Sequence, residues 1–133
     1  MQRRFLPALR DDRGRPGAEA TAWEGWISPR GRRVDITGRI NTSHPERVYN
    51  VDDRVGCYAI LYRPGADNDY VAYVGYSKYL QSEIDKKYRE FDVANASFPF
   101  TAVYVSNAAV AEEYELDLIR YYAPPWNTRF WKA

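Results

Sequence analysis

The chain has 133 residues, of which 45% are hydrophobic and 28% charged, a composition that fits one folded domain and excludes a disordered chain. Its single cysteine, Cys57, excludes an internal disulfide and a cysteine-based zinc site, which favours a reducing compartment, the cytoplasm. No apolar run approaches the roughly 18 residues of a membrane span, and the start of the chain has too short an apolar stretch for us to expect a signal peptide.

The net charge of +1 is distributed unevenly along the chain. Residues 1–50 contain ten arginines and six acidic residues, whereas residues 51–133 contain nine basic and twelve acidic residues. A basic arm on a mildly acidic body is common in proteins that contact phosphate backbones, and a solvated tail has the same composition. We therefore predict a basic N-terminal arm or extension over residues 1–50. The arginines that we consider as nucleic-acid contacts are Arg3, Arg4, Arg30, Arg32, Arg33 and, in the body, Arg89.

The extension has little regular pattern. Residues 1–20 are rich in Arg, Gly, Pro and Asp without periodicity, which predicts a loop or a poorly ordered arm. Residues 21–50 contain short apolar runs between turn-forming residues, which predicts an irregular hairpin that packs Trp23 and Trp26 on the domain.

Regular patterns begin near residue 55. The apolar runs over residues 55–62 and 70–75 predict two strands, and the turn-forming residues between them predict a connecting turn. Apolar residues recur at helical spacing over residues 78–91, which predicts an amphipathic helix. Residues 98–105 predict a third strand.

A second helix is expected after the third strand. Asn107 is a suitable N-cap, and the helix should run to about Tyr122, because Pro124 and Pro125 end it. The order strand, strand, helix, strand, helix predicts an α/β fold of the α+β kind over residues 51–133. It would be a small, mainly antiparallel three-stranded sheet flanked by helices.

Two short motifs in the predicted hairpin mirror each other: Gly56-Cys57-Tyr58 and Tyr73-Val74-Gly75. A register in which paired numbers sum to 131 would set Tyr58 opposite Tyr73 and Gly56 opposite Gly75. Directly opposed residues share a face of the sheet. Glycine in a strand often marks the close approach of a ligand or of another backbone. The motifs alone also fit an ordinary cross-strand tyrosine pair.

A carboxylate interrupts the apolar face of the second helix. Around Glu115 this face consists of Ala111, Leu118, Ile119 and Tyr122. The side chains that we expect on the solvent face are Glu113, Asp117 and Arg120. Because a buried carboxylate is costly unless it is paired or bound to a cation, Glu115 is either a metal ligand or the partner of a tyrosine or arginine.

Taken together, residues 55–127 resemble a GIY-YIG nuclease domain. The matched positions are Gly56, Tyr58, Tyr73, Gly75, Glu115, Ile119, Pro124 and Asn127. Each motif is short, but their order, spacing and predicted secondary structure agree.

The resemblance implies metal-dependent hydrolysis of phosphodiester bonds in nucleic acid, with DNA as the expected substrate. Glu115 would hold one Mg²⁺ or Mn²⁺ ion, and water and phosphate oxygens would complete its shell. Tyr58 or Tyr73 would act as the general base, and Asn127 would orient the site through its amide. The tyrosines, Glu115 and Asn127 should then converge on one pocket.

One position departs from the family pattern. The family usually has an arginine ten residues after the first tyrosine of the second motif, where it faces the scissile phosphate, and this chain has Glu83 there. Lys78 and Lys87 are the candidates to replace that positive charge. The alternative function is a catalytically degenerate module of the same fold that binds nucleic acid or protein. A small interaction domain that resembles the family by convergence ranks below both.

Overall fold

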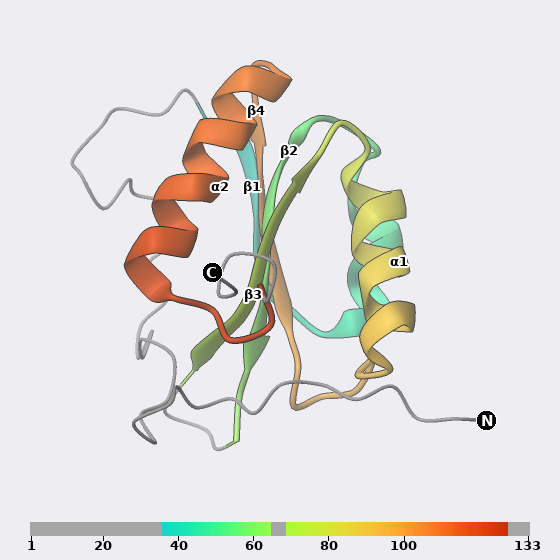
Figure 1. Cartoon of the computed structure of the whole chain (residues 1–133). Helices are drawn as coiled ribbons and strands as arrows, with labels where there is room; N and C mark the ends of the chain where they lie inside the picture. Colours follow the sequence, from blue (N-terminus) through green and yellow to red (C-terminus); the bar gives the residue numbers. More distant parts are fainter. Residues whose placement is uncertain (1–35, 65–68, 128–133) are drawn as a thin grey trace.

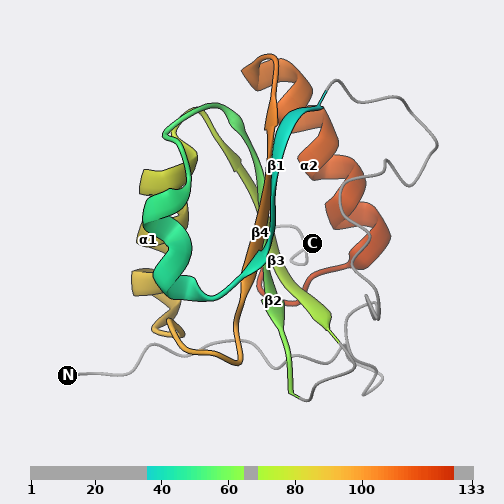
Figure 2. The same cartoon turned by 180° about the vertical axis from the view of Figure 1, so that it is seen from behind.

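The computed structural model describes residues 36–64 and 69–127, which form a four-stranded antiparallel sheet with helices on both faces (Figure 1). In chain order the elements are β1 (Ile36–Ser43), the 3-10 helix η1 (Pro45–Asn50), β2 (Gly56–Tyr62), β3 (Tyr70–Ser77), α1 (Leu80–Phe91), β4 (Phe100–Val105) and α2 (Ala108–Tyr122). The helix α1 and the short helix η1 lie on one side of the sheet, and α2 lies on the other (Figure 2).

The strands follow the order β1-β4-β2-β3, so that β2 and β4 are central and β1 and β3 are the edges. Every residue of β4 is buried, as is every residue of β2 except the last. These two strands are rich in apolar residues without polar alternation because helices cover both of their faces.

The alternation of side chains along the strands creates two cores. One lies between the sheet and α1 with η1, and it is rich in aromatic rings: Tyr58, Tyr73, Tyr88, Phe91, Phe100 and Trp126. The other lies between the sheet and α2, and it is mostly aliphatic: Cys57, Val71, Val74, Val103, Ala111 and Leu118. Cys57 and Tyr58 are neighbours in β2 and therefore belong to different cores.

The predicted boundaries of the helices are confirmed within two residues. In α2 the side chain of Asn107 accepts a hydrogen bond from the backbone N–H of Val110, as an N-cap does. The helix ends at Tyr122, and the next residue, Ala123, has a left-handed backbone (φ 48°) and directly precedes Pro124. Among the described residues, no helix is both long and apolar enough to cross a lipid bilayer.

The predicted sheet of three strands is too small, because the observed sheet has a fourth strand, β1. β1 comes from the predicted N-terminal extension and pairs antiparallel with β4, with Ile36 opposite Val105 and Ile40 opposite Ala102. Residues 36–43 are therefore an edge strand of the same sheet rather than part of an irregular hairpin. The rest of that prediction, including the two tryptophans, falls within residues 1–35 and lies outside the described residues.

The predicted register of the β2–β3 hairpin is also wrong, by two residues. Tyr58 lies opposite Gly75, and Tyr73 lies opposite Ile60. Because side chains alternate with a period of two, this shift leaves both tyrosines on one face of the sheet. The prediction of a shared face is thus confirmed, although the two tyrosines are diagonal neighbours rather than directly opposed.

Candidate functional site

The two motif tyrosines meet in the core beneath α1. The centroids of the Tyr58 and Tyr73 rings are 6.0 Å apart, and their planes are inclined by 38°. Tyr73 also packs edge-on against Phe91 near the end of α1, at 5.2 Å between ring centroids. Tyr58 is fully buried and Tyr73 nearly so. The sheet and α1 therefore hold two phenols side by side, as the motifs predict.

The two motif glycines leave room for the protein's own atoms. A Cβ added to Gly75 would lie 2.6 Å from the hydroxyl oxygen of Tyr58, and one added to Gly56 would lie 2.0 Å from the carbonyl oxygen of Val103. Gly56 thus permits close approach of a neighbouring backbone, one of the two roles predicted for it. The space over Gly75 holds the end of the Tyr58 ring.

The hydroxyl of Tyr58 donates a hydrogen bond of 3.0 Å to a carboxylate oxygen of Glu83 on α1. Burial raises the pKa of Tyr58 well above its ordinary value, and the Tyr73 and Glu83 side chains beside it raise that pKa further. The phenolate form is therefore strongly disfavoured at neutral pH. The sequence identified Glu83 as the departure from the family pattern, but it did not predict the hydrogen bond between Glu83 and Tyr58.

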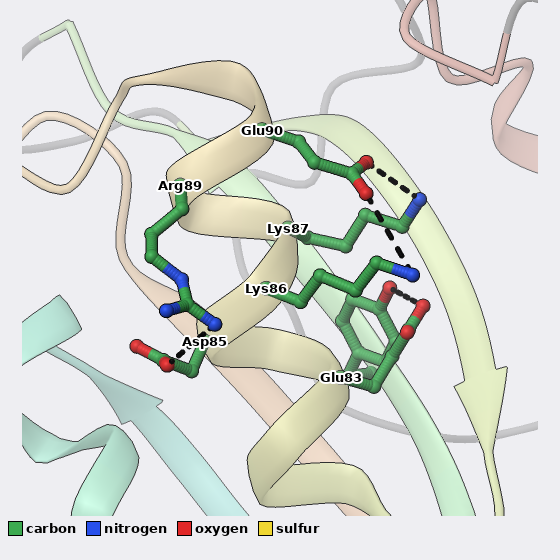
Figure 3. A network of polar contacts seen from close by, with 7 residues as sticks. Glu83, Asp85, Lys86, Lys87, Arg89 and Glu90 are labelled. Carbon is green, nitrogen blue, oxygen red and sulfur yellow. Dashed lines mark hydrogen bonds and ion pairs between the residues drawn. The ribbon is translucent and has the colours of Figure 1, made fainter.

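Of the two lysines proposed to replace the arginine, Lys87 lies at this site. Its ammonium nitrogen is 5.4 Å from the centroid of the Tyr73 ring and 3.1 Å from a carboxylate oxygen of Glu90 (Figure 3). Burial lowers the pKa of Lys87, but Tyr73, Glu90 and Glu83 raise it by more, so that the lysine stays charged. Glu90 follows Lys87 by three residues, a helical spacing that could have identified the pair. Lys78 precedes α1 and is exposed.

The remaining predicted contacts to nucleic acid are only partly described. Arg89 is exposed on α1 and forms an ion pair of 3.3 Å with Asp85 (Figure 3). The other arginines lie outside the described residues: Arg3, Arg4, Arg30, Arg32 and Arg33.

Glu115 is buried, as its position on α2 predicts, but it lies in the other core. Only 3% of its surface is exposed. The pKa of the Cys57 thiol is raised mainly by burial and also by the nearby Glu115 carboxylate. The thiol donates a hydrogen bond of 3.1 Å to the carbonyl oxygen of Ala111 on α2. Glu115 therefore approaches the sheet beside Cys57, on the α2 face, whereas Tyr58 and Tyr73 occupy the α1 face.

The predicted solvent face of α2 is wrong at one residue. Asp117 is buried, with 6% of its surface exposed, whereas Glu113 and Arg120 are exposed as expected. The helix thus buries two acidic side chains, Glu115 and Asp117.

A magnesium ion does not fit the surroundings of Glu115. Mg²⁺ keeps several of its water molecules when one or two carboxylates bind it, so its site needs an opening to solvent. The Glu115 carboxylate is enclosed, and the side chains on the same face of the helix are Ala111, Leu118 and Ile119, all buried. Within residues 36–64 and 69–127, no group of three or more His, Cys, Asp or Glu side chains could hold a metal ion.

Asn127 binds the edge of the sheet. Its side-chain oxygen accepts a hydrogen bond of 3.0 Å from the N–H of Val74, and its side-chain nitrogen donates one of 2.7 Å to the carbonyl oxygen of Val74. The N–H of Trp126 donates to the carbonyl oxygen of Ala72, which extends this pairing along β3. The segment thus acts as a short substitute for a fifth strand. The predicted convergence of Tyr58, Tyr73, Glu115 and Asn127 on one pocket is not observed.

No protein-family model matches the chain, and no curated protein and no solved structure matches it either. The resemblance to GIY-YIG nucleases therefore rests on the matched positions in the sequence alone. The structure brings two of these side chains together, Tyr58 and Tyr73, and adds Glu83 and Lys87 to them.

Proposed function

We propose that this chain is a nucleic-acid-binding module with a GIY-YIG-like fold that does not cut its ligand. The observation that supports this best is the hydrogen bond between the Tyr58 hydroxyl and the Glu83 carboxylate. By the resemblance, position 83 is the place of an arginine that faces the scissile phosphate. A carboxylate stands there instead and binds one of the two phenols.

Glu83 opposes phosphodiester hydrolysis in two ways. Its negative charge repels a phosphate, and the transition state of the reaction adds further negative charge. It also engages the hydroxyl of Tyr58, whose raised pKa disfavours the phenolate that would accept a proton. With Glu115 on the opposite face of the sheet, the groups that the resemblance assigns to one catalytic centre are divided.

The binding activity is supported by the distribution of charge. Residues 1–50 carry ten arginines and no lysine, and the two of them that the structure describes, Arg39 and Arg47, are both exposed. Arginine side chains bind phosphate oxygens through two parallel hydrogen bonds, which suits contacts to a DNA backbone. A cytoplasmic location, which the single cysteine favours, is part of this proposal.

A second candidate is the endonuclease that the resemblance implies, which would hydrolyse DNA with Mg²⁺ or Mn²⁺. The observation in its favour is the position of Lys87, whose charge lies over the ring of Tyr73. In an active enzyme Lys87→Ala would lower the cleavage rate by about 10² or more, as the loss of a charge contact to the transition state does. Lys86→Ala, which removes an exposed lysine of the same helix, is the matched control.

Two measurements on the full chain distinguish the candidates. DNA binding is followed by fluorescence anisotropy at increasing salt, and cleavage is followed by the nicking of supercoiled plasmid with Mg²⁺ or Mn²⁺. We expect binding that weakens with salt and no nicking. Nicking that requires the metal and is lost in Glu115→Gln would support the endonuclease instead. A chain that does neither contradicts both proposals.

A further inference from the structure

Two exposed tyrosines lie on neighbouring segments, Tyr49 in η1 and Tyr79 directly before α1. Among the described large hydrophobic side chains, three are strongly exposed: Tyr49 (76%), Tyr79 (62%) and Tyr121 (61%). The ring of Tyr121 packs against that of Tyr122, at 4.8 Å between centroids. The rings of Tyr49 and Tyr79 contact no other aromatic ring among the described residues. Their faces are therefore open to solvent and add little to the core.

Hydrogen bonds join the backbone segments that carry the two tyrosines. The side-chain nitrogen of Gln81, two residues after Tyr79, donates to the carbonyl oxygens of Tyr49 and Val51, each at 3.1 Å. The N–H of Leu80 donates to the carbonyl oxygen of Arg54 at 3.0 Å. The end of η1 is thereby held against the first turn of α1, and η1 runs beside this helix (Figure 2).

Two basic side chains in these segments are available to phosphate groups. Arg54 and Lys78 are exposed there. The guanidinium of Arg54 lies 4.6 Å from the centroid of the Tyr104 ring, which holds it in place. Three exposed acidic side chains lie in the same segments, Glu46, Asp52 and Asp53, and Asp53 uses both carboxylate oxygens on Ser82 at the start of α1. The N-terminal end of a helix adds partial positive charge.

We propose that Tyr49 and Tyr79 form a stacking surface for the bases of single-stranded nucleic acid, with Arg54 and Lys78 beside them for the phosphates. A duplex does not offer the faces of its bases, whereas an unpaired strand offers one at every nucleotide. This inference rests on the proposed nucleic-acid binding and names the part of the described surface that performs it. The arginines of residues 1–50 supply the additional charge that long strands require.

The test is the binding of a fluorescently labelled oligothymidylate to the full chain, measured by anisotropy. Because stacking on one aromatic ring contributes about 1–3 kcal/mol per base, the double variant Tyr49→Ala/Tyr79→Ala should bind about tenfold more weakly or worse. Tyr49→Phe/Tyr79→Phe keeps both rings and should bind like the unaltered chain. Tyr121→Ala removes an equally exposed ring on α2 and should also bind normally. Circular dichroism checks that each variant keeps its fold.

The dependence on salt sharpens the test. Loss of the rings should weaken binding by the same factor at low and high salt, because stacking is not screened. Arg54→Ala or Lys78→Ala should lower the salt dependence by about one unit of slope for each charge removed. If the unaltered chain binds and the double alanine variant binds as tightly, or if a duplex competes better than a single strand, the stacking surface is wrong and the proposed function stands. If the unaltered chain binds no nucleic acid, the proposed function itself fails.

Discussion

The two faces of the sheet differ in chemistry although they share the same strands. The α1 face joins two phenols to Glu83 and Lys87, which are partly exposed, so that polar groups reach from the core to the surface. The α2 face is mostly aliphatic and encloses Cys57 with the Glu115 carboxylate. Adjacent residues of β2 point to opposite faces, so a sequence motif that looks continuous is divided by the sheet. Matching residues along a chain therefore does not establish that their side chains meet.

The largest effect that we expect is at Gly56, where the strands are closest. An added Cβ would lie 2.0 Å from the carbonyl oxygen of Val103 and 2.6 Å from a methyl carbon of Leu80. Because a backbone atom cannot rotate away as a side chain can, Gly56→Ala should lower the free energy of unfolding by about 3 kcal/mol or more. Urea denaturation measures this.

Gly38→Ala is the matched control for Gly56→Ala. Its added Cβ would lie 3.1 Å from a ring carbon of Tyr104, a side chain that can shift. We expect a loss below about 1 kcal/mol at this position, which is within the range of tolerated changes. Equal losses at the two glycines would mean that the close contact of β2 with β4 at Gly56 is not as described.

A smaller loss is expected at Asn127, beyond the edge of both cores. Asn127→Ala removes two hydrogen bonds to the backbone of Val74 and leaves a buried N–H and a buried C=O without these partners. The free energy of unfolding should fall by about 2 kcal/mol. Asn127→Asp keeps an acceptor for the N–H but loses the donor, so its effect should lie between those of the alanine variant and the unaltered chain. A variant that keeps full stability but loses a metal-dependent cleavage would instead assign Asn127 to catalysis.

Features of the fold that depend on neighbouring residues could be predicted from the sequence, and features that depend on residues far apart in the chain could not. The N-cap at Asn107 and the end of α2 before Pro124 depend on neighbouring residues, and both were predicted correctly. Strand β1 was not predicted, because its residues alternate between half-buried and exposed and pair with β4, a strand far away in the sequence. The hairpin register depends on an irregularity between Ile60 and Leu61 that no local pattern indicates.

In the candidate site, too, only the features set by local periodicity could be predicted. The shared face of Tyr58 and Tyr73 follows from the period of a strand, and the burial of Glu115 follows from the period of a helix. Which face of the sheet α2 would cover is set by its connection to β4 and by the packing of the whole chain. That choice placed Glu115 beside Cys57, and the sequence carries no local signal for it.

The smallest expected effect is at Tyr58 on the α1 face, and it depends on pH. Tyr58 ionises near pH 10 when unfolded, whereas burial, Tyr73 and Glu83 raise its pKa in the folded protein. The unfolded chain therefore loses this proton first, and the stability that Tyr58 contributes is present below pH 10 and falls as the pH rises beyond it. Tyr58→Phe should cost about 1 kcal/mol at neutral pH through the lost hydrogen bond to Glu83.

Urea denaturation between pH 8 and pH 11, conditions set by the ordinary tyrosine pKa of about 10, checks this prediction. Stability should decline less steeply in Tyr58→Phe than in the unaltered chain above pH 10. Burial also raises the pKa of Cys57, Tyr88, Tyr114 and Tyr122, so a residual decline should remain in the variant. Identical slopes for both proteins would show that Tyr58 ionises as readily in the folded state as in the unfolded one.

The division of the motif between two faces is tested most directly by titrating the protein with Mg²⁺ and following its backbone amide resonances by NMR. Because the Glu115 carboxylate is enclosed beside Cys57, we predict that the resonances of Cys57, Glu115 and Tyr73 do not change as Mg²⁺ is added. A saturable change at Glu115 that extends to Tyr73 would contradict the account, since it would place the carboxylate and the phenol at one metal-binding centre.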